Sequence, residues 1–286
     1  MKQIIKNKQS LFLAQKKKLR EAGCEDFKES TKLLFSEAYG IPLNQSYDYQ
    51  TNKDIDDHDS IFLSMVNRRA VGEPTSHIIR SRSFWKDDFY IEETVLDPRP
   101  ESEMIIEFTR KQLFDGMKVL DLGCGSGCIG LSIHRENPEI SLSLSDFSNK
   151  ALSVAKKNAL ELKIECKFIH SNLFSNINEK FDLIVANLPY VEGHSFLNLQ
   201  REIILYEPHE ALYGGICGID IIKLFLSEVG KHLKAKGKFV IEFGEGQDTL
   251  IKQELLRLKF SNFDFHRDLN GINRIVCVIN NTLNLD

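Results

Sequence analysis

The sequence predicts an α/β protein, with a doubly wound, seven-stranded sheet preceded by a small all-helical domain. Three patterns support this fold class. Residues 1–72 carry apolar side chains at helical spacing and show little strand character. From Met117 onward, short apolar segments alternate with helical ones, as in parallel βαβ units. Near the C-terminal end, Asn270-Gly271 separates two further strand-like segments and predicts a closing hairpin.

The first domain is expected to span residues 1–72 and to be helical around its own core. A break at Gly40 to Pro42 interrupts the helical pattern. The basic run from Lys16 to Lys18 is interpreted as a solvated helix face. The residues expected in this core are Leu11, Leu13, Leu19, Phe27, Leu33, Leu34, Phe35, Ile61, Phe62, Met65 and Val66.

A β-hairpin linker is expected over residues 73–97. Two segments in this range, His77–Arg80 and Phe84–Ile91, have the composition of short strands. Pro98 to Glu101 then interrupts the strand pattern, and a helix is expected over residues 102–114.

The third domain is expected over residues 98–286 and carries the α/β repeat. Helices are expected at Ala151–Leu162 and Asp220–Leu233. In open sheets of this kind, ligands bind beyond the carboxyl ends of the strands, where the strand order reverses. The predicted strands are Lys118–Leu122, Ser141–Ser145, Glu165–His170, Phe181–Ala186, Lys238–Phe243, Phe263–Arg267 and Arg274–Ile279.

Composition narrows the classes of partner. The formal net charge is -4, so the chain shows no overall basic excess, and we expect no stable binding to nucleic acid. The 6 cysteines are scattered without a CxxC pair, which indicates reduced thiols and no metal site. No apolar stretch reaches the roughly 18 residues that a membrane span needs. The N-terminal segment lacks the apolar core of a signal peptide, so a cytoplasmic protein is expected.

A glycine-rich turn follows the first predicted strand of the third domain. The segment from Val119 to Gly127 reads VLDLGCGSG. Glycine lets the backbone approach a ligand closely, and the following helix presents free N–H groups there. Gly130 also completes a GxGxxG pattern, which nicotinamide and flavin enzymes share. The residues expected to bind a cofactor in this turn are Gly123, Cys124, Gly125, Ser126 and Gly127.

Two aspartates narrow the choice of cofactor. Asp121 lies two residues before the first glycine of the turn, where its carboxylate would repel a diphosphate. The same carboxylate suits the sulfonium and ammonium groups of S-adenosylmethionine. Asp146 follows the second predicted strand, about 20 residues on, where a carboxylate can hydrogen-bond both ribose hydroxyls. The two aspartates therefore favour an S-adenosylmethionine-dependent methyltransferase of Rossmann-like fold over a nicotinamide dehydrogenase.

The fourth predicted strand ends in Asn187-Leu188-Pro189-Tyr190, which we predict to be the catalytic segment. An amide or arylamine nitrogen is a poor nucleophile, because its lone pair is delocalised. The Asn187 side-chain oxygen and the Leu188 carbonyl can accept hydrogen bonds from an NH2 group and aim its lone pair at the methyl group. Pro189 holds Leu188 extended, and Tyr190 can stack on the planar acceptor.

These motifs together resemble the HemK-type family of peptide-chain release factor glutamine N5-methyltransferases. The resemblance covers most of residues 72–280 and implies a fold with a helical N-terminal domain and a hairpin linker. It implies methyl transfer to the glutamine of a release factor's Gly-Gly-Gln loop. The blocks that carry it, besides the two motifs, are Gly72–Pro74, Phe84-Trp85, Val95–Glu101, Tyr206–Pro208, Ala211–Gly215, Gly218–Asp220, Ile241–Gln247 and Asp268–Gly271.

Residue roles follow from the resemblance. It assigns Gly123 to Gly127 and Asp146 to the cofactor, with Leu173 packed against the adenine, and Asn187 to Tyr190 to the glutamine amide. Asn187 would also face the cofactor's methyl group. A release factor is the expected partner, bound by a monomer. Arg99 and Glu101, in the block before the predicted helix, are candidates to close the cofactor site.

One departure from the family keeps a second acceptor open. The family usually has proline where this sequence has Leu188. Asn-Leu-Pro-Tyr is instead typical of ribosomal RNA adenine dimethyltransferases. An RNA or DNA N6-adenine methyltransferase is therefore the alternative prediction, although the blocks at Pro98–Glu101 and Glu207-Pro208 favour the release factor family. A cofactor-binding protein without catalysis is a third possibility, against which the intact Asn187 argues.

Overall fold

A computed structural model of the protein describes residues 2–45 and 56–280. The chain divides into two compact units. Unit 1 comprises Met1–Ser81 together with Gln200–Tyr206, and unit 2 comprises Arg82–Leu199 and Glu207–Asp286. The division predicted from the sequence, 1–72, 73–97 and 98–286, did not join residues 200–206 to the helical part. It also included residues 1, 46–55 and 281–286, which lie outside the described residues.

Unit 1 is helical. Phe35 lies at the centre of its core, with ring centroids 5.4 Å from Phe12 and 5.2 Å from Phe62 in edge-to-face packing. The buried Arg69 binds Asp26 at 2.7 Å and Glu202 at 2.6 Å, so an ionic cluster attaches residues 200–206 to this unit. Its helices are α1 (Lys2–Glu21), α2 (Phe27–Tyr39), the 3-10 turn η1 (Leu43–Gln45), α3 (Asp56–Ala70), α4 (Thr75–Ile79) and α8 (Arg201–Tyr206).

Some predictions for this unit were wrong. Leu13 and Ile61 are exposed, because they fall on the outer faces of their helices, and Phe12 and Ile78 are buried in the core instead. The predicted strand His77–Arg80 belongs to helix α4, which ends at Arg80 in the left-handed conformation. The predicted hairpin exists further along the chain. It pairs β1 (Ser81–Phe84) with β2 (Asp87–Tyr90).

Unit 2 contains a seven-stranded sheet in the order β5-β4-β3-β6-β7-β9-β8. Strands β3 to β7 pair in parallel, and β9 is antiparallel to both of its neighbours. The chain passes outward from β3 to β5 and then returns to β6 on the other side of β3. Because the strand order reverses between β3 and β6, the carboxyl ends of these strands mark the predicted ligand position. The strands are β3 (Lys118–Leu122), β4 (Ser141–Asp146), β5 (Lys167–His170), β6 (Phe181–Asn187), β7 (Leu233–Glu242), β8 (Phe263–Arg267) and β9 (Asn273–Ile279).

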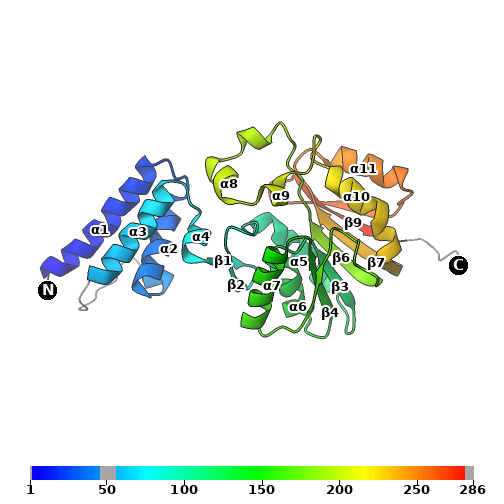
Figure 1. Ribbon diagram of the computed structural model, residues 1–286, viewed down its shortest axis with the longest axis horizontal. Helices are drawn as coiled ribbons and strands as arrows, with labels where there is room; N and C mark the ends of the chain where they lie inside the picture. Colours follow the sequence, from blue (N-terminus) through cyan, green and yellow to red (C-terminus); the bar gives the residue numbers. More distant parts are fainter. Residues whose placement is uncertain (1, 46–55, 281–286) are drawn as a thin grey trace. The chain divides into compact units, whose positions relative to one another are not determined.

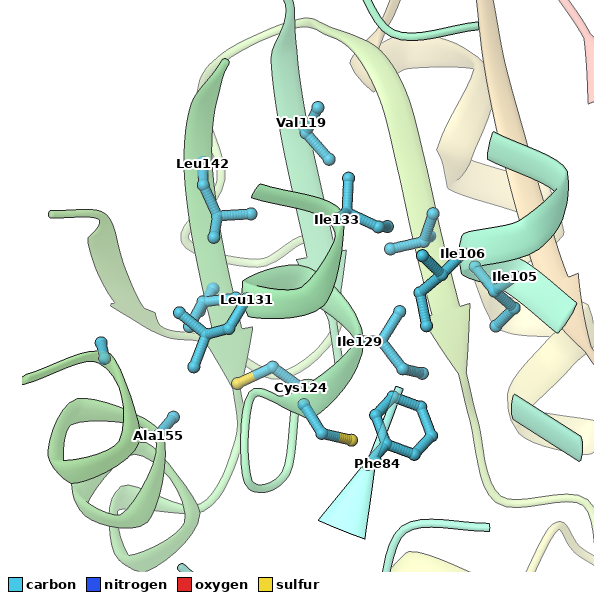
Figure 2. Packing of buried hydrophobic residues seen from close by; sticks show 14 of the residues in the cluster. Phe84, Ile105, Ile106, Val119, Cys124, Ile129, Leu131, Ile133, Leu142 and Ala155 are labelled. Carbon is cyan, nitrogen blue, oxygen red and sulfur yellow. The ribbon is translucent and has the colours of Figure 1, made fainter. Parts of the chain in front are cut away.

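Helices cover both faces of the sheet, as in a Rossmann-like methyltransferase domain (Figure 1). Side chains along each strand alternate between the two faces, since successive residues of a strand point to opposite sides. Val119 packs in the core beneath α6, for example, whereas Leu120 packs in the core on the α10 side. Figure 2 shows the first of these cores, in which Ile129, Leu131 and Ile133 of α6 lie over Val119 and Leu142.

The helices of unit 2 differ from the predicted ranges mainly at their ends. The helix predicted over 102–114 is α5, followed by one 3-10 turn, and the helix predicted to reach Leu233 ends at Val229. The α-helices are α5 (Glu103–Thr109), α6 (Cys128–Glu136), α7 (Asn149–Glu161), α9 (His209–Leu212), α10 (Asp220–Val229) and α11 (Asp248–Arg257). The 3-10 turns are η2 (Pro100–Ser102), η3 (Arg110–Gln112), η4 (Phe196–Asn198) and η5 (Gly230–His232).

The closing hairpin joins β8 to β9 through residues 268–272, and Gly271 takes φ +81° in this turn, as the Asn270-Gly271 pair predicted. Among residues 2–45 and 56–280, no helix is both long and apolar enough to span a membrane.

Candidate active site

A cavity of about 930 Å³ lies within unit 2 at the carboxyl ends of β3, β4 and β6. Its volume lies in the range of small-molecule binding sites, and its position is the one at which open α/β sheets bind ligands. The lining residues come from the segment 94–102, the glycine turn, the start of α6, the loops after β4, β5 and β6, and helices α9 and α10. The predicted site residues among them are Gly123, Cys124, Gly125, Ser126, Asp146, Leu173, Asn187, Leu188 and Pro189.

The glycine turn has the backbone conformation that its composition predicted. Gly123, Gly125 and Gly127 have φ values of +76°, +55° and +80°, a region that other residues rarely adopt. Two consecutive N–H groups, of Gly123 and Cys124, donate to the Ser145 carbonyl at 2.8 and 2.9 Å. The turn is therefore held against the end of β4, and its backbone forms one wall of the cavity.

Two residues assigned to cofactor binding do not line the cavity. Gly127 faces the core, where an added Cβ would lie 3.2 Å from both Ala155 and Leu131. Asp121 points toward α6, because side chains alternate along β3, and its Oδ2 accepts a hydrogen bond of 2.8 Å from the Gly130 N–H. Asp121 is buried, and burial raises its pKa to about 7. Its carboxylate thus holds the first turn of α6 and does not line the cavity, where the sequence analysis expected it.

Asp146 occupies the predicted position at the end of β4 and lines the cavity. Its Oδ2 accepts from the Gly125 N–H at 2.9 Å and its Oδ1 from the Ser148 N–H at 2.8 Å. Burial raises the pKa of Asp146, although these backbone hydrogen bonds lower it. Each carboxylate oxygen has a second lone pair, so the side chain can still accept from a pair of ligand hydroxyls.

Part of the cavity wall is apolar. Leu173, Phe147 and Ile129 line it. Leu173 has φ +45°, which is unusual for a branched residue, and the Ser171 hydroxyl donates to its carbonyl at 2.8 Å. The loop thereby presents Leu173 to the cavity and offers a planar ring a surface for packing, without aromatic stacking from this position.

Asn187 is the last residue of β6 and faces the cavity. Its Nδ2 donates to the Ser102 hydroxyl at 2.9 Å. Leu188 follows with a buried side chain, whose Cδ2 would lie 3.2 Å from a Cβ added at Gly123. The strand end and the glycine turn are therefore in close contact, as the positions of the two motifs predicted. Pro189 lines the cavity and restricts the backbone of Leu188 to extended conformations.

Tyr190 differs from its predicted role. Its ring is not among the groups that line the cavity but packs against the core on the α10 side. A Cβ added at Gly244 would lie 3.1 Å from the Tyr190 ring. The Tyr190 hydroxyl donates to Glu242 at 3.1 Å, and burial next to that carboxylate raises the Tyr190 pKa. Stacking on an acceptor is thus not the role this geometry gives Tyr190.

Several cavity residues were missed by the sequence analysis. Phe196, His209 and Tyr213 form an aromatic wall, with the Phe196 ring 4.9 Å from His209 and 6.4 Å from Tyr213. Ser102 lines the cavity and binds Glu242, a residue to which the sequence suggested no role. No local spacing signals such residues, since they come from loops and strands far apart in the chain.

Arg99 also lines the cavity, and it binds both oxygens of the buried Glu207 at 2.7 Å. Its predicted partner in closing the cofactor site, Glu101, is exposed and does not line the cavity.

Comparisons with known proteins extend these observations. The sequence model of a protein family, the methyltransferase small domain, matches residues 97–215 of this chain. A release factor glutamine methyltransferase of Koribacter versatilis is 37% identical over 224 residues, which is 77% of this chain and 79% of that protein. The chain belongs to the release factor glutamine methyltransferase family. A second member, from Agrobacterium fabrum, is 30% identical over 93% of this chain and 94% of its own length.

Solved structures agree on the fold. A methyltransferase from Pyrococcus furiosus superposes with a TM-score of 0.54, covering 70% of this chain and 92% of its own, at 14% identity. As a member of its family, the protein is an S-adenosylmethionine-dependent methyltransferase, which confirms the enzyme class and cofactor predicted from the glycine turn and the two aspartates.

Proposed function

We propose that this methyltransferase acts on the side-chain amide nitrogen, N5, of a glutamine in a release factor, within its Gly-Gly-Gln loop. The proposal rests on the position of Asn187. This residue is the last of β6 and lines the same cavity as the glycine turn. Relatives that bear the name release factor glutamine methyltransferase span most of the chain, and this supports the choice of substrate.

The lining residues fit the methyl donor. We assign Asp146 to the ribose hydroxyls, Leu173 and Phe147 to the adenine, and the backbone of residues 123–126 to the remainder of the molecule. The open glycine backbone and the free lone pairs of Asp146 are the features that suit it. When bound, S-adenosylmethionine supplies an electrophilic methyl group on its sulfonium. Gly127 and Asp121 contribute from the core side, by shaping the turn and holding α6.

The acceptor side of the cavity fits a planar amide. The Asn187 oxygen and the Leu188 carbonyl are proposed to accept one hydrogen bond each from the amide NH2, which reduces delocalisation and directs the lone pair. Phe196 and Tyr213 offer flat apolar surfaces around the amide plane. Orientation and hydrogen bonding then carry the catalysis, without a strong base. Pro189 fixes the Leu188 backbone, and Tyr190 anchors the end of the segment through Glu242.

The interaction with the substrate is proposed to be transient. With a net charge of -4, the protein offers no overall attraction to a phosphate backbone, which supports a protein substrate over stable nucleic-acid binding. We propose that the protein acts in the cytoplasm, where a release factor would be its substrate, and that a monomer is the active form.

The test is methyl transfer from labelled S-adenosylmethionine, with a release factor and ribosomal RNA offered in parallel reactions. We expect label in the release factor, at the glutamine of its Gly-Gly-Gln loop, and loss of labelling when that glutamine is replaced by asparagine. The matched control replaces another exposed glutamine of the release factor and should keep the label. Labelling of the RNA and not of the protein would support the alternative function, an adenine methyltransferase, of which the Asn-Leu-Pro-Tyr motif is also typical.

A further inference from the structure

A chain of hydrogen bonds leads from the acceptor side of the cavity into the sheet. Asn187 Nδ2 donates to Ser102 Oγ at 2.9 Å, and Ser102 Oγ donates to Glu242 Oε2 at 2.6 Å. The second oxygen of Glu242 accepts from the Tyr190 hydroxyl at 3.1 Å. Ser102 and Glu242 are 2% and 1% exposed, so water does not compete for these bonds.

The direction of this chain is set at its buried end. Burial raises the pKa of Glu242, whereas the hydrogen bonds from Ser102 and Tyr190 lower it and favour the ionised form. In that form the carboxylate can only accept hydrogen bonds, so the hydroxyl proton of Ser102 is committed to Glu242. The Ser102 oxygen then has only acceptor capacity left for Asn187. Asn187 must therefore turn its NH2 group toward Ser102 and its Oδ1 away from it. The two ends of an asparagine amide are almost equal in size, so packing alone would not distinguish these orientations.

We propose that Ser102 and Glu242 are positioning residues for methyl transfer, because they fix the Asn187 amide with its oxygen toward the acceptor nitrogen. This inference rests on the proposed function, since an acceptor with an NH2 group needs an oxygen at that point. A flipped amide would place two NH2 groups against each other, and neither could accept. Glu242 thereby acts on the reaction through two hydrogen bonds, without touching the substrate.

The first test is a double-mutant cycle on the single-turnover rate of methyl transfer. Ser102→Ala should lower the rate by roughly tenfold to a hundredfold, because a misoriented Asn187 no longer aims the nucleophile. In an Asn187→Ala background, the same change should cost nothing further, since Ser102 acts only through Asn187. Losses that multiply in the double variant would overturn the inference.

Three companion variants separate orientation from general damage. Ser102→Thr keeps the hydroxyl and should recover most of the rate that Ser102→Ala loses. Glu242→Gln keeps the size of the side chain but adds a hydrogen-bond donor next to Ser102. The Ser102 hydroxyl can then either donate to or accept from Asn187, so both orientations of the Asn187 amide are permitted and methyl transfer should slow. Ser132→Ala removes a buried hydroxyl that makes no hydrogen bond within the described part of the chain, and it should leave the rate unchanged. Affinity for S-adenosylhomocysteine, measured by calorimetry, should stay the same in all of them.

The second test needs no protein substrate. Nitrogen-15 NMR of the Asn187 side-chain amide should show slow exchange of the hydrogen bound to Ser102, and fast exchange in Ser102→Ala and Glu242→Gln. An amide signal that neither change affects would contradict the positioning role. If the wild-type amide is protected but no release factor is methylated, the orientation stands and the proposed substrate is wrong. The two ideas can therefore fail separately.

Discussion

Arg99 binds Glu207 through one guanidinium nitrogen, Nη2, which donates to both carboxylate oxygens at 2.7 Å. The two residues are far apart in the sequence, and both lie in unit 2. The Glu207 side chain is 3% exposed and that of Arg99 is 28% exposed. Arg99 is also part of the cavity wall, so the pair joins the segment before α5 to the loop that carries α9.

Replacing Arg99 with alanine should destabilise the protein. The change removes the Arg99 guanidinium from the buried Glu207 carboxylate, which should lower the free energy of unfolding by about 3 kcal/mol. Urea unfolding measures this loss. Glu207→Gln in the same background should restore part of it, because the buried negative charge is then removed. Arg257→Ala, which removes an exposed ion pair with Glu254, is the control and should leave the urea midpoint unchanged. Equal midpoints for the Arg99 and Arg257 variants would contradict this reading.

Asp146→Ala should weaken cofactor binding. The variant loses the carboxylate proposed for the ribose and the acceptor that holds the Gly125 N–H, so the affinity for S-adenosylhomocysteine should fall by roughly 1–3 kcal/mol. Isothermal calorimetry is the measurement. NAD should show no binding to the wild-type protein, since the family to which the chain belongs uses S-adenosylmethionine. Tight NAD binding, or an Asp146→Ala variant with wild-type affinity, would be incompatible with the assigned cofactor site.

Leu188→Pro should keep glutamine methylation. Only the backbone carbonyl of Leu188 is proposed to bind the acceptor amide. The variant also has the proline that is usual at this position in the family. Some stability should be lost, because the buried side chain packs against Gly123. The check is a methylation assay together with thermal unfolding. A folded but inactive variant would show that the leucine side chain takes part in the reaction.

Asp121 should make stability fall as the pH rises. Its pKa is about 7 in the folded protein, mainly through burial, against about 4 in an unfolded chain. Between these values the folded protein holds a proton that the unfolded chain has released, so the free energy of unfolding decreases with rising pH. One such proton gives a slope of about 1.4 kcal/mol per pH unit.

Asp121→Asn should remove that slope between pH 5 and about 7. Urea unfolding at several pH values compares the variant with wild type, and Asp88→Asn, at an exposed site, is the control that should keep the slope. A variant that retains the full pH dependence would mean that Asp121 is already ionised in the folded protein at pH 5.

The sheet was predictable because its evidence is local. Buried strands such as Phe181 to Ala186 appear as largely apolar segments, interrupted here only by Asp182. The composition of the glycine turn likewise predicts its backbone conformation. The short strand predicted at His77–Arg80 was wrong because four residues give too little periodicity to separate a strand from one helical turn. Leu13 and Ile61 were misplaced for a related reason, since an apolar residue next to the buried face of a helix can still be exposed.

The site was predictable only where one motif supplies both the side chain and its position. Asn187 and Asp146 each end a strand, so the fold places them at the cavity. Ser102 meets Asn187 only through tertiary packing, and no spacing in the sequence predicts that contact. Glu242 ends β7 opposite Asn187, but its hydrogen bond to Ser102 is equally absent from the sequence pattern. Asp121 was expected at the ligand because it is close to the glycines in sequence, but alternation along β3 turns it toward α6.

The most direct test of the account is single-turnover methyl transfer by Asn187→Ala and Asn187→Asp, with cofactor affinity measured on the same preparations. Asn187→Ala removes the acceptor oxygen, so transfer should slow by about a hundredfold or more while cofactor affinity changes by under about 1 kcal/mol. Asn187→Asp keeps an oxygen but adds a negative charge that favours the cationic ground state, so the rate should fall while cofactor binding holds or tightens. Thermal stability should stay near that of the wild type in both. If both variants bind the cofactor normally and methylate at the wild-type rate, Asn187 does not hold the acceptor and the proposed site is wrong.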